Sequence, residues 1–420
     1  MIASIRQKFN AAFSEKTHQN YLAALNTPFP NALDFTVAET PIFIDKYFTE
    51  KILATGDYVN QVIQSDRFNS ITEPSLENVP LFPKQNPLPA CIVMDFAIAI
   101  NDQNELVPAL IELQGFPSLF AYEILQDDCI HKTYTIPAGF SPYLNGYTKE
   151  KYLAHLETIL KGDTLIDTKK NLDTINRNIS DSTKDTLKHT VLLEILPHQQ
   201  KTRIDFYCTE KYFNIPIVCI TEIFVEGNNL YYERDGSKIK IDRIYNRIVL
   251  DELKNQTKEI QEKGALLQTN LNIEWITHPH HFFRISKFLL PFLKHPYIPK
   301  TQFVDQLKKL PTVLEKYILK PPFSFAGQGV IIDISAADIM NIKDPSGWIL
   351  QEKVKYANCI ETPTGPAKAE LRLFYFWDKA SQKYIATMNL ARLSKGKMIG
   401  VDYNKNKQWV GGSLAYFEKF

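Results

Sequence analysis

The sequence predicts a mixed α/β (α+β) protein, and three patterns lead to that prediction. Apolar runs at 91–100 and 106–116 surround a short polar turn, which is typical of two paired strands. Residues 190–224 alternate strand, helix and strand, which predicts a small α/β unit with a parallel strand pair. Residues 266–420 carry further strand-like runs. At 420 residues the chain is too long for one small core, so we expect several regions.

Composition narrows the class of protein further. A formal net charge of +1 argues against a broad nucleic-acid surface, and no window approaches the ~20 apolar residues of a membrane span. The five cysteines are scattered and lack a CxxC pair, which favours a reducing compartment over a disulfide framework or a zinc site. We therefore expect a cytoplasmic protein with neither nucleic acid nor membrane as a partner.

Three regions follow one another along the chain. Residues 1–150 begin with helices and end with the strand pair at 91–116. Residues 151–265 contain the strand–helix–strand unit, followed by a hairpin-like stretch with Gly and Asn turns. Residues 266–420 begin with a helical segment and continue with strands and a β-hairpin.

The segment YILKPPFSFAGQGVIID, 317–333, is the sharpest local signal. Its apolar strand ends in Lys320, and a loop containing Ser324, Gly327 and Gly329 follows. Backbone N–H groups of such a loop can approach a polyphosphate closely, and a lysine at the strand end adds a fixed cation. An ordinary hairpin loop with an exposed lysine is the alternative. No Walker A or GxGxxG motif occurs.

The strand-like run WILQEKV, 348–354, follows about twenty residues later. Gln351 and Glu352 beside apolar positions could bind a nucleoside, with backbone groups pairing with the base and the carboxylate reaching the ribose. A solvated Gln-Glu pair on an edge strand is the alternative interpretation.

Asp95, Glu112 and Gln114 form another signal. Glu112 and Gln114 are two residues apart in one strand and so face the same side; strand pairing would bring Asp95 beside them. Mg²⁺ prefers few protein carboxylates completed by phosphates and water. A carboxylate in an apolar strand is costly unless it is paired or binds a metal. A solvated sheet face remains the alternative.

Arg247, Arg372 and Arg392 each lie in strand-like runs. Arginine in a strand is usually a surface residue, but one in a cleft would bind phosphate or carboxylate through two hydrogen bonds. The HPHH cluster at 278–281 is interpreted as a loop or helix-start feature, because no acidic or cysteine partner has zinc spacing.

The order of these features resembles the ATP-grasp superfamily. The matching elements are Lys287, Lys320-Pro321 with Gly327-Gln328-Gly329, Gln351-Glu352 and Glu370-Leu371-Arg372. The metal-binding elements, Asp95 and Glu112-Leu113-Gln114, come first instead of last. This order is similar to the circularly permuted branch, which includes glutathionylspermidine synthetase-like proteins. The resemblance covers about 90–125 and 190–420. Gln114 stands where that family usually has Asn, and Val93 where the synthetase branch often has Arg.

The resemblance implies a circularly permuted ATP-grasp-like fold with a small Rossmann-like pre-ATP-grasp substrate domain at 151–265. It implies ATP and Mg²⁺ as cofactors. By carry-over, the nucleotide contacts are Lys287, Lys320, Ser324, Gly327, Gln328, Gly329, Gln351, Glu352 and Val354, and the metal ligands are Asp95, Glu112 and Gln114. Arg372 or Arg392 would steady the transferring phosphoryl group, while Arg247 is a candidate to hold a substrate carboxylate.

The activity so implied is an ATP-dependent carboxylate–amine ligase that acts through an acyl phosphate on small-molecule substrates. A phosphotransferase with the same site, a non-catalytic nucleotide-binding module and a purely structural α/β protein are the alternatives, because one fold hosts many functions. The sequence predicts no oligomeric state.

Overall fold

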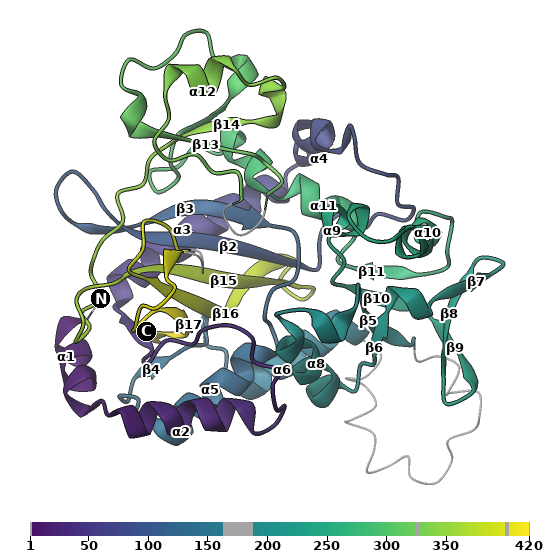
Figure 1. Ribbon diagram of the computed structural model, residues 1–420, viewed down its shortest axis with the longest axis horizontal. Coiled ribbons are helices and arrows are strands. Elements are labelled where there is room, and N and C mark those ends of the chain that lie inside the picture. The colour runs from purple at the N-terminus through teal and green to yellow at the C-terminus, as the bar shows by residue number, and fades with distance from the viewer. Residues whose placement is uncertain (1, 163–187, 325–327, 400–402, 420) are drawn as a thin grey trace.

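The computed structural model describes residues 2–162, 188–324, 328–399 and 403–419, which form five β-sheets and their surrounding helices. Figure 1 shows the largest sheet at the centre, with a small lobe above it and an α/β unit beside it. The helices are α1 (Ala3–Ala12), α2 (Glu15–Asn26), α3 (Lys46–Ile63), α4 (Phe68–Thr72), α5 (Tyr122–Thr133), α6 (Lys149–Lys161), α8 (Arg203–Phe213), α9 (Leu250–Lys254), α10 (Lys258–Leu266), α11 (Pro279–Arg284) and α12 (Ala336–Met340).

The central antiparallel sheet has the strand order β17-β16-β15-β2-β3 and joins segments that are far apart in the sequence. Its strands are β2 (Cys91–Ile100), β3 (Leu106–Gln114), β15 (Lys368–Asp378), β16 (Lys383–Ser394) and β17 (Gly411–Ser413). The predicted pairing of 91–100 with 106–116 is confirmed, as is the hairpin formed by β15 and β16.

Alternation along β2 assigns the two faces of this sheet different neighbours. Ile92 and Met94 point to the face that packs against α3. Cys91 and Val93 point to the other face, where α5 and α6 cover the sheet. Asp95 follows on that same face. The functional side chains of the central sheet therefore lie opposite α3.

Another antiparallel sheet, with the order β12-β14-β13, forms the small lobe together with α12 (Figure 1). Its strands are β12 (Thr301–Phe303), β13 (Tyr317–Lys320) and β14 (Ile349–Glu352). The strand predicted after the glycine loop is wrong: that segment contributes only an isolated bridge between Leu319 and Ile331. Gly329 has a φ of +72°, so the turn requires a residue without a Cβ.

The α/β unit contains the parallel sheet β11-β10-β5-β6, with α8 connecting β5 to β6, so the predicted parallel pair is confirmed. Its strands are β5 (Thr190–Glu194), β6 (Ile217–Cys219), β10 (Arg243–Asn246) and β11 (Glu274–Ile276). The strand predicted over 215–224 is shorter in the structure, because a 3₁₀ turn occupies Ile220–Glu222. A hairpin sheet of β7 (Phe224–Glu226), β8 (Asn229–Arg234) and β9 (Ser237–Ile241) adjoins this unit.

The two ends of the chain meet in one further sheet. There β18 (Ala415–Glu418) lies between β1 (Ile42–Ile44) and β4 (Phe140–Ser141). Together with β2 and β3 in the central sheet, this pairing binds residues 1–150 to the C-terminal region. Within the described ranges, no helix combines the length and apolar character needed to cross a membrane.

Candidate functional site

Asp95 is the centre of a charged network on the face of the central sheet opposite α3. The register places it directly opposite Glu112 on β3 and Arg372 on β15. Its carboxylate is fully buried and accepts hydrogen bonds from Arg372 Nε and Nη2 at 2.7 and 2.6 Å, and from Arg392 Nη2 at 2.8 Å. Burial by itself would raise the pKa of Asp95, but the two guanidiniums outweigh it and lower that pKa.

Glu370 continues this network toward the small lobe. It lies opposite Arg392 in the register and pairs with Arg392 Nη2 at 2.9 Å. The hydroxyl of Tyr356 donates to Glu370 Oε1 at 2.5 Å. Burial raises the pKa of Glu370, which Arg392 partly offsets. Because Tyr356 lies in the segment between β14 and β15, this bond connects the small lobe to the central sheet.

Lys287 contributes a cation from the short 3₁₀ segment η6 (Lys287–Phe292). The segment begins at Lys287 because the Ser286 side chain caps it by accepting from the Phe288 N–H. The buried Lys287 ammonium contacts Glu112 Oε1 at 2.7 Å and donates to the Ser324 carbonyl at 2.5 Å. One lysine therefore joins the edge strand β3 to the glycine loop.

Lys320 is the last residue of β13 and is also buried. Its ammonium donates to Gln351 Oε1 at 2.7 Å and to the Ile111 carbonyl at 3.3 Å. Burial, together with the nearby Lys287 charge, lowers the pKa of Lys320 to about 8. The Gln351 amide donates in turn to Thr301 Oγ1 at 2.9 Å. The Gln351 side chain thus holds the lysine in place.

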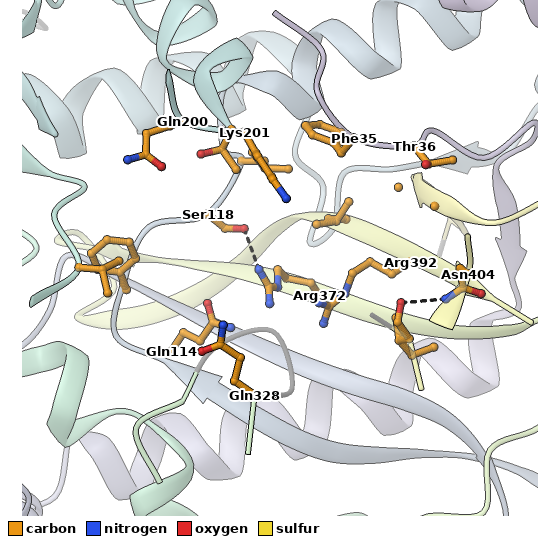
Figure 2. Close-up of a pocket in the computed structure, with 18 of the residues that line it drawn as sticks. Phe35, Thr36, Gln114, Ser118, Gln200, Lys201, Gln328, Arg372, Arg392 and Asn404 are labelled. Atoms are coloured by element: carbon orange, nitrogen blue, oxygen red, sulfur yellow. Dashed lines mark hydrogen bonds between the residues drawn. The ribbon is translucent and has the colours of Figure 1, made fainter. Parts of the chain in front are cut away.

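A cavity of about 900 Å³ adjoins this network and reaches the α/β unit. Figure 2 shows Arg372 and Arg392 at its centre, Ser118 on one side and Gln114 with Gln328 on the other. Ser118 is bound by two arginines. Arg372 Nη1 donates to Ser118 Oγ at 3.2 Å, and Arg247 Nη1 donates to the Ser118 carbonyl at 2.7 Å.

The predicted residues are distributed over two neighbouring places. The cavity is lined by Gln114, Arg247, Ser324, Gln328, Arg372 and Arg392, whereas Lys287, Lys320, Gln351, Glu352 and Val354 are not among its lining residues. Val354 packs on a small-residue patch of β2 and β3, formed by Ala97, Ala99 and Ala109. Glu352 is partly exposed, and its Oε1 lies 3.7 Å from Lys300 Nζ. Gly327 lies outside the described residues.

Among the described residues, no three or more His, Cys, Asp or Glu side chains lie close enough together to bind one metal ion. A metal site built from several carboxylates therefore does not fit them. Both oxygens of Asp95 are engaged by guanidiniums. Glu112 and Gln114 share one side of β3 and fit the sparser requirement of a Mg²⁺ ion whose shell is completed by phosphates and water.

Sequence reasoning missed several functional candidates. Ser118 and Tyr356 carry no motif and acquire their place only through the fold. Glu194, by contrast, had a detectable signal: it ends the apolar run TVLLE and lines the cavity although it is buried. The rule that flagged Glu112, a carboxylate within an apolar strand, applies to it equally.

Comparisons with known proteins define the fold only. No family model matches the sequence, and no curated protein matches it. Among solved structures, the chain is similar to a glutathione synthetase-like effector from Globodera pallida in its apo form. The TM-score is 0.52 over 97% of each chain, with 8% sequence identity. The mixed α/β architecture is thus shared over nearly the whole length, while identity this low leaves activity and substrate open.

Proposed function

We propose that this protein is an ATP- and Mg²⁺-dependent carboxylate–amine ligase with a circularly permuted ATP-grasp-like fold. The observation that carries the proposal is the cation network at the junction of the central sheet, the small lobe and the glycine loop. Lys287, Lys320, Arg372 and Arg392 all contribute to it, and each is held by hydrogen bonds within the described residues. Such a preorganised set of cations suits a polyphosphate.

Lys287 and Lys320 would bind the ATP phosphates, and Ser324, Gln328 and Gly329 of the loop would close over them. In the structure the two lysines bond to Glu112 and Gln351 respectively. Phosphate oxygens would replace Glu112 as the partner of Lys287 and would accept a further proton of the Lys320 ammonium. Glu352 and the 351–354 segment would hold the nucleoside beside the small-residue patch on which Val354 packs. Gln351 would keep Lys320 aimed at the phosphates.

Glu112 and Gln114 would hold the Mg²⁺ ion, because a lysine that turns to phosphate releases the Glu112 carboxylate. Asp95 would instead fix Arg372 and Arg392, whose guanidiniums could then steady the γ-phosphoryl group. When bound, ATP supplies the phosphoryl group that converts a substrate carboxylate to an acyl phosphate. Arg247 would hold that carboxylate in the cavity, at the edge formed by the parallel strands.

Acid-dependent ADP release in the presence of hydroxylamine tests this proposal. Hydroxylamine traps an acyl phosphate as a hydroxamate, so a panel of carboxylic acids should contain members that give ADP and hydroxamate together. ADP with phosphorylated acceptor but no hydroxamate would instead identify a phosphotransferase. Absence of ADP with every acid, in a preparation that binds Mg-ATP, would refute turnover.

One observation favours a second candidate, a non-catalytic nucleotide-binding module. Asp95 and Glu112 are both neutralised by side chains of the chain itself, so the predicted metal ligands already have cationic partners. Nucleotide binding without any acid-dependent ADP release identifies this alternative.

A further inference from the structure

The cavity contains an acidic side that the proposed ligase mechanism does not use. Glu194 ends β5 and Arg247 follows β10, at the carboxyl ends of two adjacent parallel strands. The N–H of Arg247 donates to the Leu193 carbonyl at 3.0 Å, which fixes the two side chains next to each other in the register. Glu252 on α9 lines the same cavity. Carboxyl ends of parallel strands are where ligands of α/β sheets bind.

Glu194 is buried, and no lysine or arginine in the described part of the chain forms an ion pair with it. Its side chain is 5% exposed, and Oε1 accepts from the N–H of Ile195 at 2.7 Å. Among the described residues Glu194 forms no ion pair, although Arg247 lies nearby. The Arg247 guanidinium instead donates to the Ser118 carbonyl and lies 3.8 Å from an Asp205 carboxylate oxygen. An ionised carboxylate held this way would face the cavity without an ion-pair partner, which costs free energy unless a ligand cation is bound.

Arg247 provides an independent sign that this wall of the cavity receives a ligand. It is 5% exposed, and its Nε has no hydrogen-bond partner within the described part of the chain. Its guanidinium packs over the Phe206 ring at 5.1 Å. Glu194 and Arg247 thus stand side by side, both buried, without forming an ion pair with each other. Both face the same cavity.

We propose that Glu194, with Glu252 beside it, binds the ammonium group of the amine substrate and accepts one of its protons before the amine attacks. This inference rests on the proposed ligase function and names the residue that handles the second substrate. Arg247 and the sheet arginines would bind the anionic partner, so the two substrates would meet across the cavity.

The chemistry balances with Glu194 as the proton acceptor. The amine nitrogen attacks the acyl carbon, the C–N bond forms, and the bond from that carbon to the phosphate oxygen breaks with its electron pair leaving on phosphate. The nitrogen loses two protons in all: the ammonium passes one to the Glu194 carboxylate before it attacks, and the one lost after the attack goes to the departing phosphate. Burial, with Glu252 adding to it, raises the pKa of Glu194 to about 8, against the lowering effects of the Ile195 N–H and Arg247. A carboxylate with that pKa is a competent base near neutral pH.

The test compares Glu194→Gln with wild type and with Glu233→Gln, a control on the exposed face of β8. One measurement follows hydroxamate and amide formation with the best acid of the panel, since hydroxylamine is neutral at pH 7 and needs no deprotonation before it attacks. The other measures binding of ethylenediamine by calorimetry, which requires no turnover and so remains informative if the ligase proposal fails.

We expect Glu194→Gln to keep hydroxamate formation and to lose amide formation by about 10²-fold or more, with the acid limb of the pH profile removed. Ethylenediamine binding should weaken in Glu194→Gln and stay unchanged in Glu233→Gln. Unchanged amide formation, or equal ethylenediamine binding in all three proteins, would overturn the inference. Parallel loss of hydroxamate and amide in a folded variant would also overturn it, because Glu194 would then act before the amine enters.

Discussion

Replacing Asp95 with asparagine removes the carboxylate to which both sheet arginines are bound. Asp95→Asn leaves the Arg372 guanidinium without its bidentate partner, while Arg392 retains Glu370 at 2.9 Å. Breaking a buried ion pair by removing one partner costs about 3–5 kcal/mol. Arg372 and Arg392 keep 14% and 29% of their side chains exposed, so water offsets part of the cost. We expect a loss near the lower end, about 3 kcal/mol.

Urea unfolding followed by tryptophan fluorescence measures this loss, because Trp377 lies on β15 with Arg372. Asp102→Asn, in the exposed turn between β2 and β3, is the matched control and should change stability by no more than about 0.5 kcal/mol. A loss below about 1 kcal/mol for Asp95→Asn, or one equal to the control, would refute the reasoning.

The same variant also reports on anion binding. The guanidiniums released from Asp95 face the cavity, so pyrophosphate should stabilise Asp95→Asn more than it stabilises wild type. The pKa of Asp95 is lowered in the folded state; its contribution is therefore complete above the unfolded pKa, about 3.9, and is lost as pH falls below that value. The stability difference between the two proteins should shrink in that acidic range.

Further predictions concern stability. Burial lowers the pKa of His278 to about 4 and that of His281 to about 3. The stability contributed by these neutral imidazoles should be fully present above pH ~6.5 and should be lost as pH falls from there. Thermal melts against pH test this, and His281→Leu should make the decrease in stability less steep. Burial raises the pKa of Glu123, whose carboxylate oxygens have no hydrogen-bond partner in the described residues. In urea unfolding, the free energy of unfolding of Glu123→Gln relative to wild type should therefore increase as pH rises above about 4.3. Gly115→Ala would place a Cβ 2.2 Å from the His281 carbonyl oxygen, and calorimetric melting should show a loss of about 1–3 kcal/mol.

Strand periodicity carried most of what the sequence could predict about the site. Because side chains alternate along a strand, the spacing of Glu112 and Gln114 was enough to place them on one side, and pairing with Asp95 followed from the polar turn at 101–105. The same reasoning could not identify the partner of Asp95. Arg372 reaches it across a strand pairing between segments nearly three hundred residues apart, which no local pattern records.

Sequence motifs also do not predict which contacts a side chain makes once it is buried. Gln351 fits a nucleoside-binding pattern by its position, yet its amide is used to hold Lys320. Lys287 was recognised by its place in the order of motifs, but its bond to Glu112 depends on how η6 packs against β3. Burial and pairing are properties of the assembled sheets, so these roles become visible only in the structure.

Calorimetric titration of Mg-ATP tests the central claim most directly. The proteins to compare are wild type, Lys320→Met and Lys308→Met, a control at an exposed lysine of the small lobe. We predict equal binding by wild type and Lys308→Met and loss of binding in Lys320→Met. In the two proteins that bind, Mg-ATP at 100 times Kd should raise the free energy of unfolding by about 2.7 kcal/mol. Equal affinity in all three proteins, or no binding by wild type, would contradict a nucleotide site built on Lys320.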